Sequence, residues 1–177
     1  MRGLVAAVVT PMNEKGDLNL NLVPKVVDYL ATKGITGIYI AGSTGEGMSL
    51  TDEERREVAE AYVFAAKGRM KSFVQVGHNS LKASADLAGH AEAIGADAVS
   101  ATPTGYFKAS SEAELVEGLL PIAEAAPKTP FYYYHIPFLS GVNLDPIKLT
   151  DISMDRLPTF CGIKYSDGAS KKKKKNF

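Results

Sequence analysis

Cysteine and long apolar runs are both scarce in this 177-residue chain. Its single cysteine, Cys161, excludes an internal disulfide and is typical of a protein from a reducing compartment. No apolar stretch approaches the roughly 18 residues that a membrane-spanning helix needs. The apolar start, residues 4–9, stops at Thr10-Pro11 and predicts a first strand rather than a signal peptide. We therefore expect a cytoplasmic protein that does not associate with a membrane.

An excess of charge of one sign is absent as well, because 20 basic residues balance 20 acidic residues. Five of the basic residues form the run Lys171–Lys175, so the rest of the chain is mildly acidic. A nucleic-acid-binding protein carries a basic surface, and this composition argues against one. The three histidines, His78, His90 and His135, are scattered and form no pair with metal-ligand spacing. We expect no metal site and no nucleic-acid partner.

What the chain does contain is a regular alternation of short apolar runs and longer helical patterns. The apolar runs are continuous, which predicts strands buried on both faces of a parallel sheet. Thr51 and Glu54 form a capping box at one helix start, and Gly34 and Gly95 suit helix C-terminal caps. The expected strands are residues 4–9, 37–41, 73–76, 98–101, 131–134 and 161–164. The expected helices are residues 22–33, 52–67, 80–94, 112–125 and 145–152.

The spacing of these elements predicts the fold class. Strand starts recur about every 25–35 residues, which is the length of one β/α unit, and six such units imply an α/β fold with a helix-covered parallel sheet. A TIM (β/α)8 barrel typically takes about 250 residues, so the sheet is either open and doubly wound or an incomplete barrel. The lysine run, which begins where a sixth helix is due, favours the incomplete barrel. We expect a partial barrel domain over residues 1–168 and a disordered lysine-rich tail over residues 169–177.

Lys164 stands out because it follows an apolar run, residues 160–163, that reads as a buried strand. A charge at the end of such a strand is costly unless it is paired, neutralised or used. One interpretation is a lysine whose ammonium group extends to water. The other is an amine that attacks a carbonyl and forms an imine, which then acts as an electron sink. The other strand ends favour the second interpretation, because catalytic groups of barrel enzymes gather there.

Two further strand ends carry groups that suit a lysine nucleophile. After the second strand, residues 42–47 read Gly-Ser-Thr-Gly-Glu-Gly, and the hydroxyls of Ser43 and Thr44 with nearby N–H groups can hold a small carboxylate. The glycines allow close backbone approach or positive φ, although the same segment would also serve as a simple turn. After the fifth strand, Tyr134 is a candidate proton relay. His135 is either a structural hydrogen-bonding group or a general base, and the former interpretation is favoured.

The loop after the fourth strand contains two neighbouring aromatic residues. Residues 102–107 read Thr-Pro-Thr-Gly-Tyr-Phe. The side chains of Tyr106 and Phe107 either line a pocket, contact another subunit or lie on a surface loop. The sequence leaves these alternatives open.

Together these motifs resemble the N-acetylneuraminate lyase and dihydrodipicolinate synthase superfamily of class I pyruvate-dependent aldolases. The resemblance covers residues 3–167 and is closest to the lyase branch. It implies that Lys164 forms a Schiff base with pyruvate, that Tyr134 relays protons, and that Ser43 and Thr44 hold the pyruvate carboxylate. Ser166 matches a position near the sugar. The implied reaction splits N-acetylneuraminate into N-acetylmannosamine and pyruvate without a metal or organic cofactor, in a homotetramer.

The chain also departs from the pattern of this superfamily in two ways. The alternative is another pyruvate-dependent aldolase of the superfamily, either a dihydrodipicolinate synthase or a 2-keto-3-deoxy sugar acid aldolase. Dihydrodipicolinate synthases usually carry an arginine where this chain has Leu139, which argues against the first of these. The superfamily barrel continues beyond its lysine strand, and the later segments bind most of the sugar. We therefore expect little or no activity from the 177-residue chain by itself.

Overall fold

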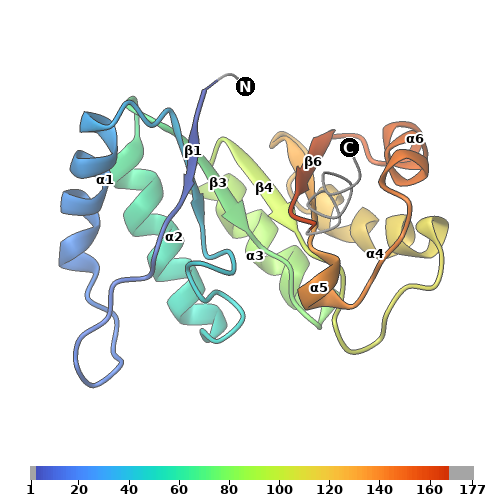
Figure 1. Ribbon diagram of the computed structural model, residues 1–177, viewed down its shortest axis with the longest axis horizontal. Coiled ribbons are helices and arrows are strands. Elements are labelled where there is room, and N and C mark those ends of the chain that lie inside the picture. Colours follow the sequence, from blue (N-terminus) through green and yellow to red (C-terminus); the bar gives the residue numbers. More distant parts are fainter. Residues whose placement is uncertain (1–2, 168–177) are drawn as a thin grey trace, which may run out of the picture.

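The computed structural model describes residues 3–167 and shows a six-stranded parallel sheet. The strands follow each other in chain order and curve into half of a barrel (Figure 1). They are β1 (Val5–Ala7), β2 (Gly37–Ile40), β3 (Lys71–Gln75), β4 (Ala98–Ala101), β5 (Phe131–His135) and β6 (Phe160–Tyr165). A doubly wound sheet reverses its strand order at a switch point, whereas this sheet does not, so the prediction of an incomplete TIM barrel is confirmed. The predicted lysine-rich tail lies outside the described residues.

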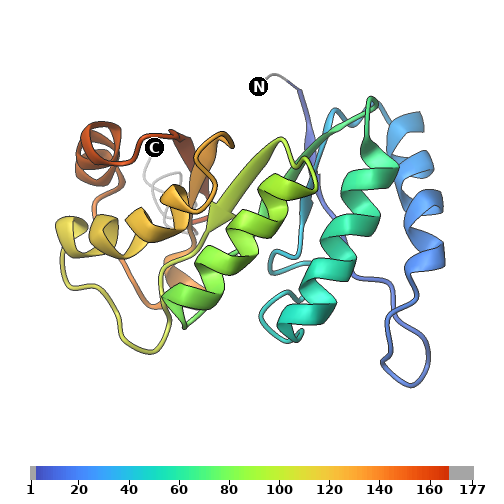
Figure 2. The same cartoon turned by 180° about the vertical axis from the view of Figure 1, so that it is seen from behind.

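Helices connect successive strands and cover one face of the sheet (Figure 2). Each predicted helix is present, and the sequence analysis missed two short ones, η1 (Leu20–Leu22) and α5 (Pro137–Ser140). The five longer helices are α1 (Val23–Thr32), α2 (Asp52–Ala66), α3 (Leu81–Ala93), α4 (Glu112–Glu124) and α6 (Pro146–Arg156). The capping box at the start of α2 is confirmed, and both Gly34 and Gly95 have the positive φ of a helix C-terminal cap. No helix in residues 3–167 is long and apolar enough to cross a membrane.

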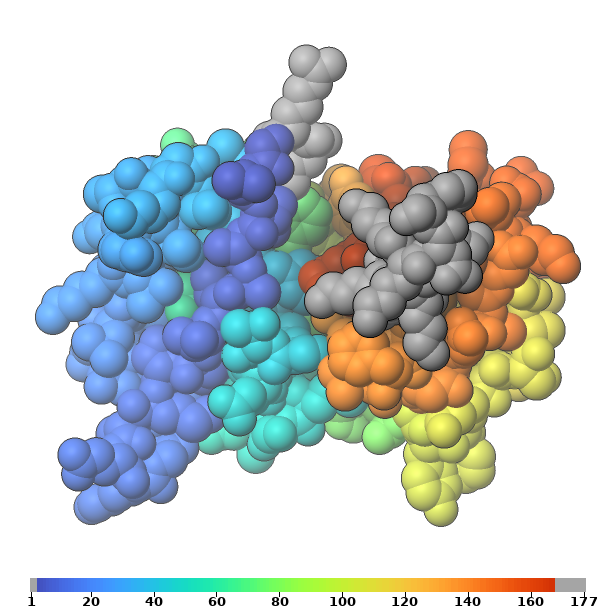
Figure 3. Space-filling view, viewed as in Figure 1, coloured from blue at the N-terminus to red at the C-terminus, as the bar shows by residue number. Residues whose placement is uncertain are grey.

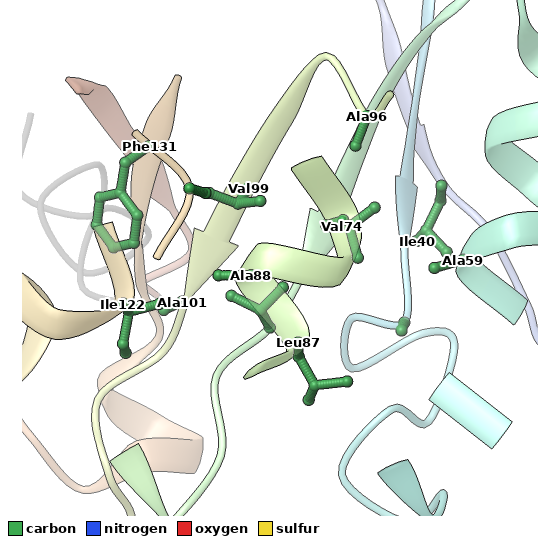
Figure 4. Close-up of a cluster of buried hydrophobic side chains, with 14 of the residues drawn as sticks. Ile40, Ala59, Val74, Leu87, Ala88, Ala96, Val99, Ala101, Ile122 and Phe131 are labelled. Carbon is green, nitrogen blue, oxygen red and sulfur yellow. The ribbon is translucent and has the colours of Figure 1, made fainter. Parts of the chain in front are cut away.

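The main hydrophobic core lies between the sheet and this helical layer. Ile40, Val74, Val99 and Phe131 project from successive strands toward apolar side chains such as Leu87 of α3 (Figure 4). A second, smaller cluster lies on the concave side of the sheet and contains Tyr39, Tyr134, Ile136 and Phe73. The candidate site is built on this second cluster. The main core packs against the opposite face of the same strands.

The first and last strands are more exposed than the sequence suggested. The prediction that the strands are buried on both faces is confirmed for β2 and β4 and is wrong for β1 and β6. Val5 is 43% exposed and Cys161 is also exposed. The reason is that each of these strands has a neighbour on one side only within residues 3–167. In the space-filling view the dark-blue residues of β1 lie uncovered on the viewed face (Figure 3).

Candidate active site

Parallel pairing of β5 and β6 brings the two principal candidate residues together. Tyr134 and Lys164 are direct partners in the register, so their side chains lie on the same face of the sheet. The Nζ of Lys164 lies 3.5 Å from the centroid of the Tyr134 ring and 3.3 Å from the hydroxyl oxygen of Ser166. Lys164 is half-buried, and Tyr134 is buried. The Lys164 side chain therefore lies against the Tyr134 ring and does not extend to water.

A β-bulge produces this pairing. Phe131 is paired with Phe160, but the next residue, Tyr132, is paired with Gly162, so Cys161 is the extra residue on β6. Without it Tyr134 would face Ile163 instead of Lys164, because a one-residue slip exchanges the two faces of a strand. Gly162 has a φ of 149°, a conformation that residues with a side chain rarely adopt. The glycine before Ile163-Lys164 thus has a structural purpose: it aims the lysine.

The loop after β2 adds Ser43 to the site. Its hydroxyl lies close enough to that of Tyr134 to help lower the pKa of the tyrosine. Thr44 follows Ser43 in the same exposed turn. Within residues 3–167 its side chain makes no hydrogen bond to Lys164 or Tyr134. Within residues 3–167 no acceptor is found for the backbone N–H groups of Ser43 and Thr44. The turn thus offers two hydroxyls and two N–H donors at the carboxyl end of β2.

The glycines of this loop do not supply positive φ, which was one of their two expected roles. Gly42, Gly45 and Gly47 all have ordinary φ values, and the positive φ values fall on Ala41 and Glu46, both at 53°. The glycines are required by close packing instead. A Cβ on Gly47 would lie 1.9 Å from the carbonyl oxygen of Ala41, which no side chain tolerates. The loop is therefore a tightly folded turn with strained non-glycine residues, a feature common at functional sites.

The electrostatics of the site favour ionisation of Tyr134. Burial by itself raises the pKa of the Tyr134 hydroxyl. Hydrogen bonds with Lys164 and Ser43 and the positive charge of Lys164 outweigh burial and bring the pKa below its ordinary value of 10.0. A tyrosine with a lowered pKa exchanges protons more readily near neutral pH. The chemistry expected of Tyr134 is thus supported by its surroundings.

His135 lies on the opposite face of β5 from Tyr134. Its buried imidazole packs within the helical side of the sheet and stacks on the Tyr165 ring at 5.1 Å between centroids. Burial lowers the pKa of His135, and the nearby Asp167 carboxylate only partly opposes this effect. A buried imidazole behind the sheet cannot reach the amine of Lys164. The geometry thus favours the structural interpretation of His135.

The aromatic pair after β4 is exposed. Tyr106 and Phe107 are 79% and 83% exposed, and their rings contact each other edge to face at 5.0 Å. The side-chain oxygen of Asn79 accepts hydrogen bonds from the N–H groups of Gly105 and Tyr106, which fixes the loop. Within residues 3–167 this pair does not line the space around Lys164. Phe107 does line a separate pocket of about 430 Å³ next to α4, so all three expected roles remain open.

Two buried residues near the site, Tyr39 and Arg55, carry no signal in the sequence that would have identified them. Tyr39 of β2 lies beside both Tyr134 and Lys164, and is described below. Arg55 of α2 donates hydrogen bonds to the carbonyl oxygens of Gln75 and Gly77 at 2.9 and 3.1 Å and to the Gln75 side chain at 2.7 Å. Burial lowers the pKa of Arg55 to about 10, so it remains charged at neutral pH. No local motif identifies such residues, because their partners are 20 or more positions away.

A groove of about 460 Å³ runs along the open side of the half barrel next to Lys164. Its walls come from both edge strands and from the concave cluster: Val5, Ala7, Tyr39, Phe73, Tyr132, Ile163, Lys164, Tyr165 and Ser166. The described residues contain no group of histidine, cysteine or carboxylate side chains that could hold a metal ion. The groove therefore presents one amine, several aromatic rings and hydroxyl groups to a ligand.

A parallel β/α half barrel with a lysine and a tyrosine at adjoining strand ends is typical of TIM-barrel aldolases. The sequence comparison makes the assignment specific: the chain belongs to the dihydrodipicolinate synthetase family, whose model matches residues 1–176. It is 44% identical to N-acetylneuraminate lyase of Rattus norvegicus and 45% identical to N-acetylneuraminate lyase A of Xenopus laevis, over 94% of this chain in both cases. These alignments cover 53% and 55% of the two relatives, so the chain spans about half their length.

The fold comparison agrees. The structure of N-acetylneuraminate lyase from Proteus mirabilis superposes with a TM-score of 0.92 and 34% sequence identity. The match covers 95% of this chain and 57% of that chain. The half barrel described above is thus similar to a little over half of a solved lyase structure.

Proposed function

We propose that this chain carries the Schiff-base centre of an N-acetylneuraminate lyase, which cleaves N-acetylneuraminate to N-acetylmannosamine and pyruvate. The observation that carries the proposal is the convergence of the Lys164 amine, the Tyr134 hydroxyl and the Ser43 hydroxyl at one end of the sheet. The similarity to lyases at 44–45% identity supports the choice of substrate. Leu139 supports it as well, because it stands where dihydrodipicolinate synthases usually carry an arginine.

The chemistry assigns a task to each group. The Lys164 amine adds to the C2 ketone of the open-chain sugar acid to give a carbinolamine. Protonation of the carbinolamine hydroxyl and loss of water then leave an iminium ion. The Tyr134 phenolate takes the proton from the C4 hydroxyl, the C3–C4 bond breaks, and its electron pair moves into the iminium ion to give an enamine. N-acetylmannosamine leaves as the aldehyde. Protonation of the enamine at C3 and hydrolysis of the imine release pyruvate and restore the lysine.

Substrate binding follows from the same geometry. The hydroxyl and N–H groups of Ser43 and Thr44 hold the carboxylate next to the ketone, since charge-assisted hydrogen bonds to a carboxylate are strong and directional. Ser166, whose hydroxyl lies 3.3 Å from Lys164, contacts the sugar side of the substrate. No cofactor is required, because the lysine itself supplies the electron sink.

The open side of the half barrel favours a second candidate function, which is binding of pyruvate without turnover. Lys164 lies on an edge strand, and the groove beside it is open to solvent. Catalysis by an amine needs a dry, enclosed environment in which the iminium ion and enamine are protected from water. This chain by itself then binds pyruvate weakly as the imine and cleaves no sugar.

Reductive trapping tests both candidates. The purified 177-residue chain is incubated with pyruvate and borohydride, and the modified residue is located by peptide mass spectrometry. We expect an adduct on Lys164 and none in Lys164→Ala. Lys33→Ala is the matched control, because Lys33 also lies over a tyrosine ring, that of Tyr29 at 5.2 Å, but on the surface. A folded chain without an adduct on Lys164 contradicts the lyase assignment. An adduct on Lys164 in a chain that releases no N-acetylmannosamine when it is given N-acetylneuraminate supports the second candidate.

We further propose a cytoplasmic homotetramer as the form of the protein. The exposed lone Cys161 supports a reducing compartment. The exposed Tyr106 and Phe107 rings support a subunit contact, because exposed aromatic pairs are enriched at interfaces. Light scattering on the purified chain measures the subunit number, and a monomer at micromolar concentration contradicts the proposal for this chain.

A further inference from the structure

We propose that Tyr39 is the positioning residue that fixes the Lys164 amine and the Tyr134 hydroxyl relative to each other. Its ring lies on the concave side of the sheet at the centre of the candidate site. The Tyr39 and Tyr134 rings meet edge to face with 5.5 Å between centroids. The Nζ of Lys164 lies 4.9 Å from the centroid of the Tyr39 ring. One side chain from β2 therefore contacts the functional groups of both β5 and β6.

Tyr39 also restricts the position of the loop that carries Ser43. A Cβ on Gly42 would lie 2.6 Å from a ring carbon of Tyr39, so the backbone just before Ser43 rests directly on the ring. All three strand ends of the site thus meet at this ring. Ser43, Tyr134 and Lys164 come from sequence positions as much as 121 residues apart, and a shared rigid wall is what gives them a fixed arrangement.

The Tyr39 ring is itself held from the far side. Its hydroxyl donates a hydrogen bond of 3.0 Å to the Ser100 hydroxyl on β4, and both residues are buried. Burial raises the pKa of Tyr39 well above its ordinary value, so this hydroxyl stays protonated and keeps its donor. A buried aromatic ring anchored at its tip cannot swing away from the lysine. Lys33 also lies over a tyrosine ring, that of Tyr29, but this ring is 61% exposed and not buried like that of Tyr39.

The catalytic roles of Lys164 and Tyr134 rest on the proposed function. Their positioning by Tyr39 can be measured without substrate. Loss of the anchor lets the ring move, and the contacts of Lys164 and Ser43 with the Tyr134 hydroxyl weaken. These contacts hold the pKa of Tyr134 down. Both Tyr39→Phe and Ser100→Ala remove the anchoring hydrogen bond but keep the aromatic ring itself, so Tyr134 stays buried. We expect both variants to raise the Tyr134 pKa toward its ordinary value, because the contacts that lower it are weakened.

The experiment is an NMR titration of the 177-residue chain labelled at the tyrosine ring carbon that bears the oxygen, with Tyr134→Phe used to assign the signal. The double variant should shift Tyr134 no further than either single variant, because all three lose the same hydrogen bond. Gly42→Ala presses on the ring from the loop and should also raise the Tyr134 pKa. Thermal unfolding of each variant shows that the titrated protein is folded.

The outcomes separate the positioning from the proposed chemistry. An unchanged Tyr134 pKa in folded Tyr39→Phe and Ser100→Ala, or a shift in only one of them, overturns the positioning by Tyr39. A shift in both without any pyruvate adduct on the wild-type chain supports the positioning and contradicts the proposed function. Where the adduct forms, the anchor variants should lower the maximal rate of trapping and leave the half-saturating pyruvate concentration unchanged, because Ser43 and Thr44 still bind the carboxylate. A purely structural role would lower the melting temperature alone.

Discussion

Replacing Gly162 by alanine tests whether the bulge in β6 really aims the lysine. The added Cβ would lie 3.4 and 3.6 Å from two ring carbons of Tyr132, which is close to ordinary contact, so steric overlap contributes little. The backbone is the main obstacle, because a φ of 149° is strained for any residue with a Cβ. Such strain costs about 1–3 kcal/mol. The reduced freedom of the unfolded chain returns about 0.4–1 kcal/mol, so we expect a net loss of about 1–2 kcal/mol.

The same substitution should also disturb the site. The strain is relieved if β6 abandons the bulge and slips by one residue, and the slip would place Ile163 opposite Tyr134. Lys164 would then face the helical side of the sheet. We therefore expect Gly162→Ala to lose most of the borohydride adduct with pyruvate and to raise the Tyr134 pKa toward its ordinary value, since the lysine contact lowers it.

Urea unfolding followed by circular dichroism measures the stability change. Gly118→Ala is the matched control, because Gly118 lies inside α4 and nothing within 4 Å would meet its Cβ. There the substitution should stabilise the chain by up to about 1 kcal/mol. The reasoning is refuted if Gly162→Ala unfolds at the wild-type urea concentration and retains both the adduct and the Tyr134 titration. Equal losses in the two variants would also refute it, since a general effect of alanine would then explain both.

Three further predictions concern single interactions. Thr51→Ala removes the capping box of α2 and should cost about 1 kcal/mol in urea unfolding, and an unchanged midpoint would show that the cap is dispensable. Burial raises the pKa of Asp97, but hydrogen bonds with Lys71 and the neighbouring backbone lower it below 3.8 overall, so its contribution to stability is present above that pH and is lost as the pH falls through the lowered pKa. The stability difference between wild type and Asp97→Asn should accordingly be larger at pH 7 than at pH 2, and a difference independent of pH would contradict this assignment. Ser43→Ala removes one hydrogen bond to the Tyr134 hydroxyl and should raise its pKa and weaken pyruvate binding, which the tyrosine titration and the trapping assay measure separately.

The elements of this fold could be predicted from local signals. The continuous apolar runs placed all six strands to within two residues at each end, because strands in a helix-covered parallel sheet are apolar on both faces. The capping box and the two glycines placed helix ends correctly. Burial of β1 and β6 could not be predicted in this way. The same apolar pattern occurs in a central and an edge strand, and only the arrangement of neighbours distinguishes them.

The sequence by itself determined the chemistry available to this protein: a lysine, a tyrosine and a Ser-Thr turn, each at the end of a strand, in the pattern of one aldolase family. Only the tertiary structure decided how these groups meet. The bulge at Cys161 and Gly162 places Lys164 beside Tyr134, strand alternation turns His135 to the far side, and the buried Tyr39 ring joins three strand ends. The physical reason is that local sequence specifies backbone preferences, whereas the face, the exposure and the partner of a side chain depend on residues far away along the chain.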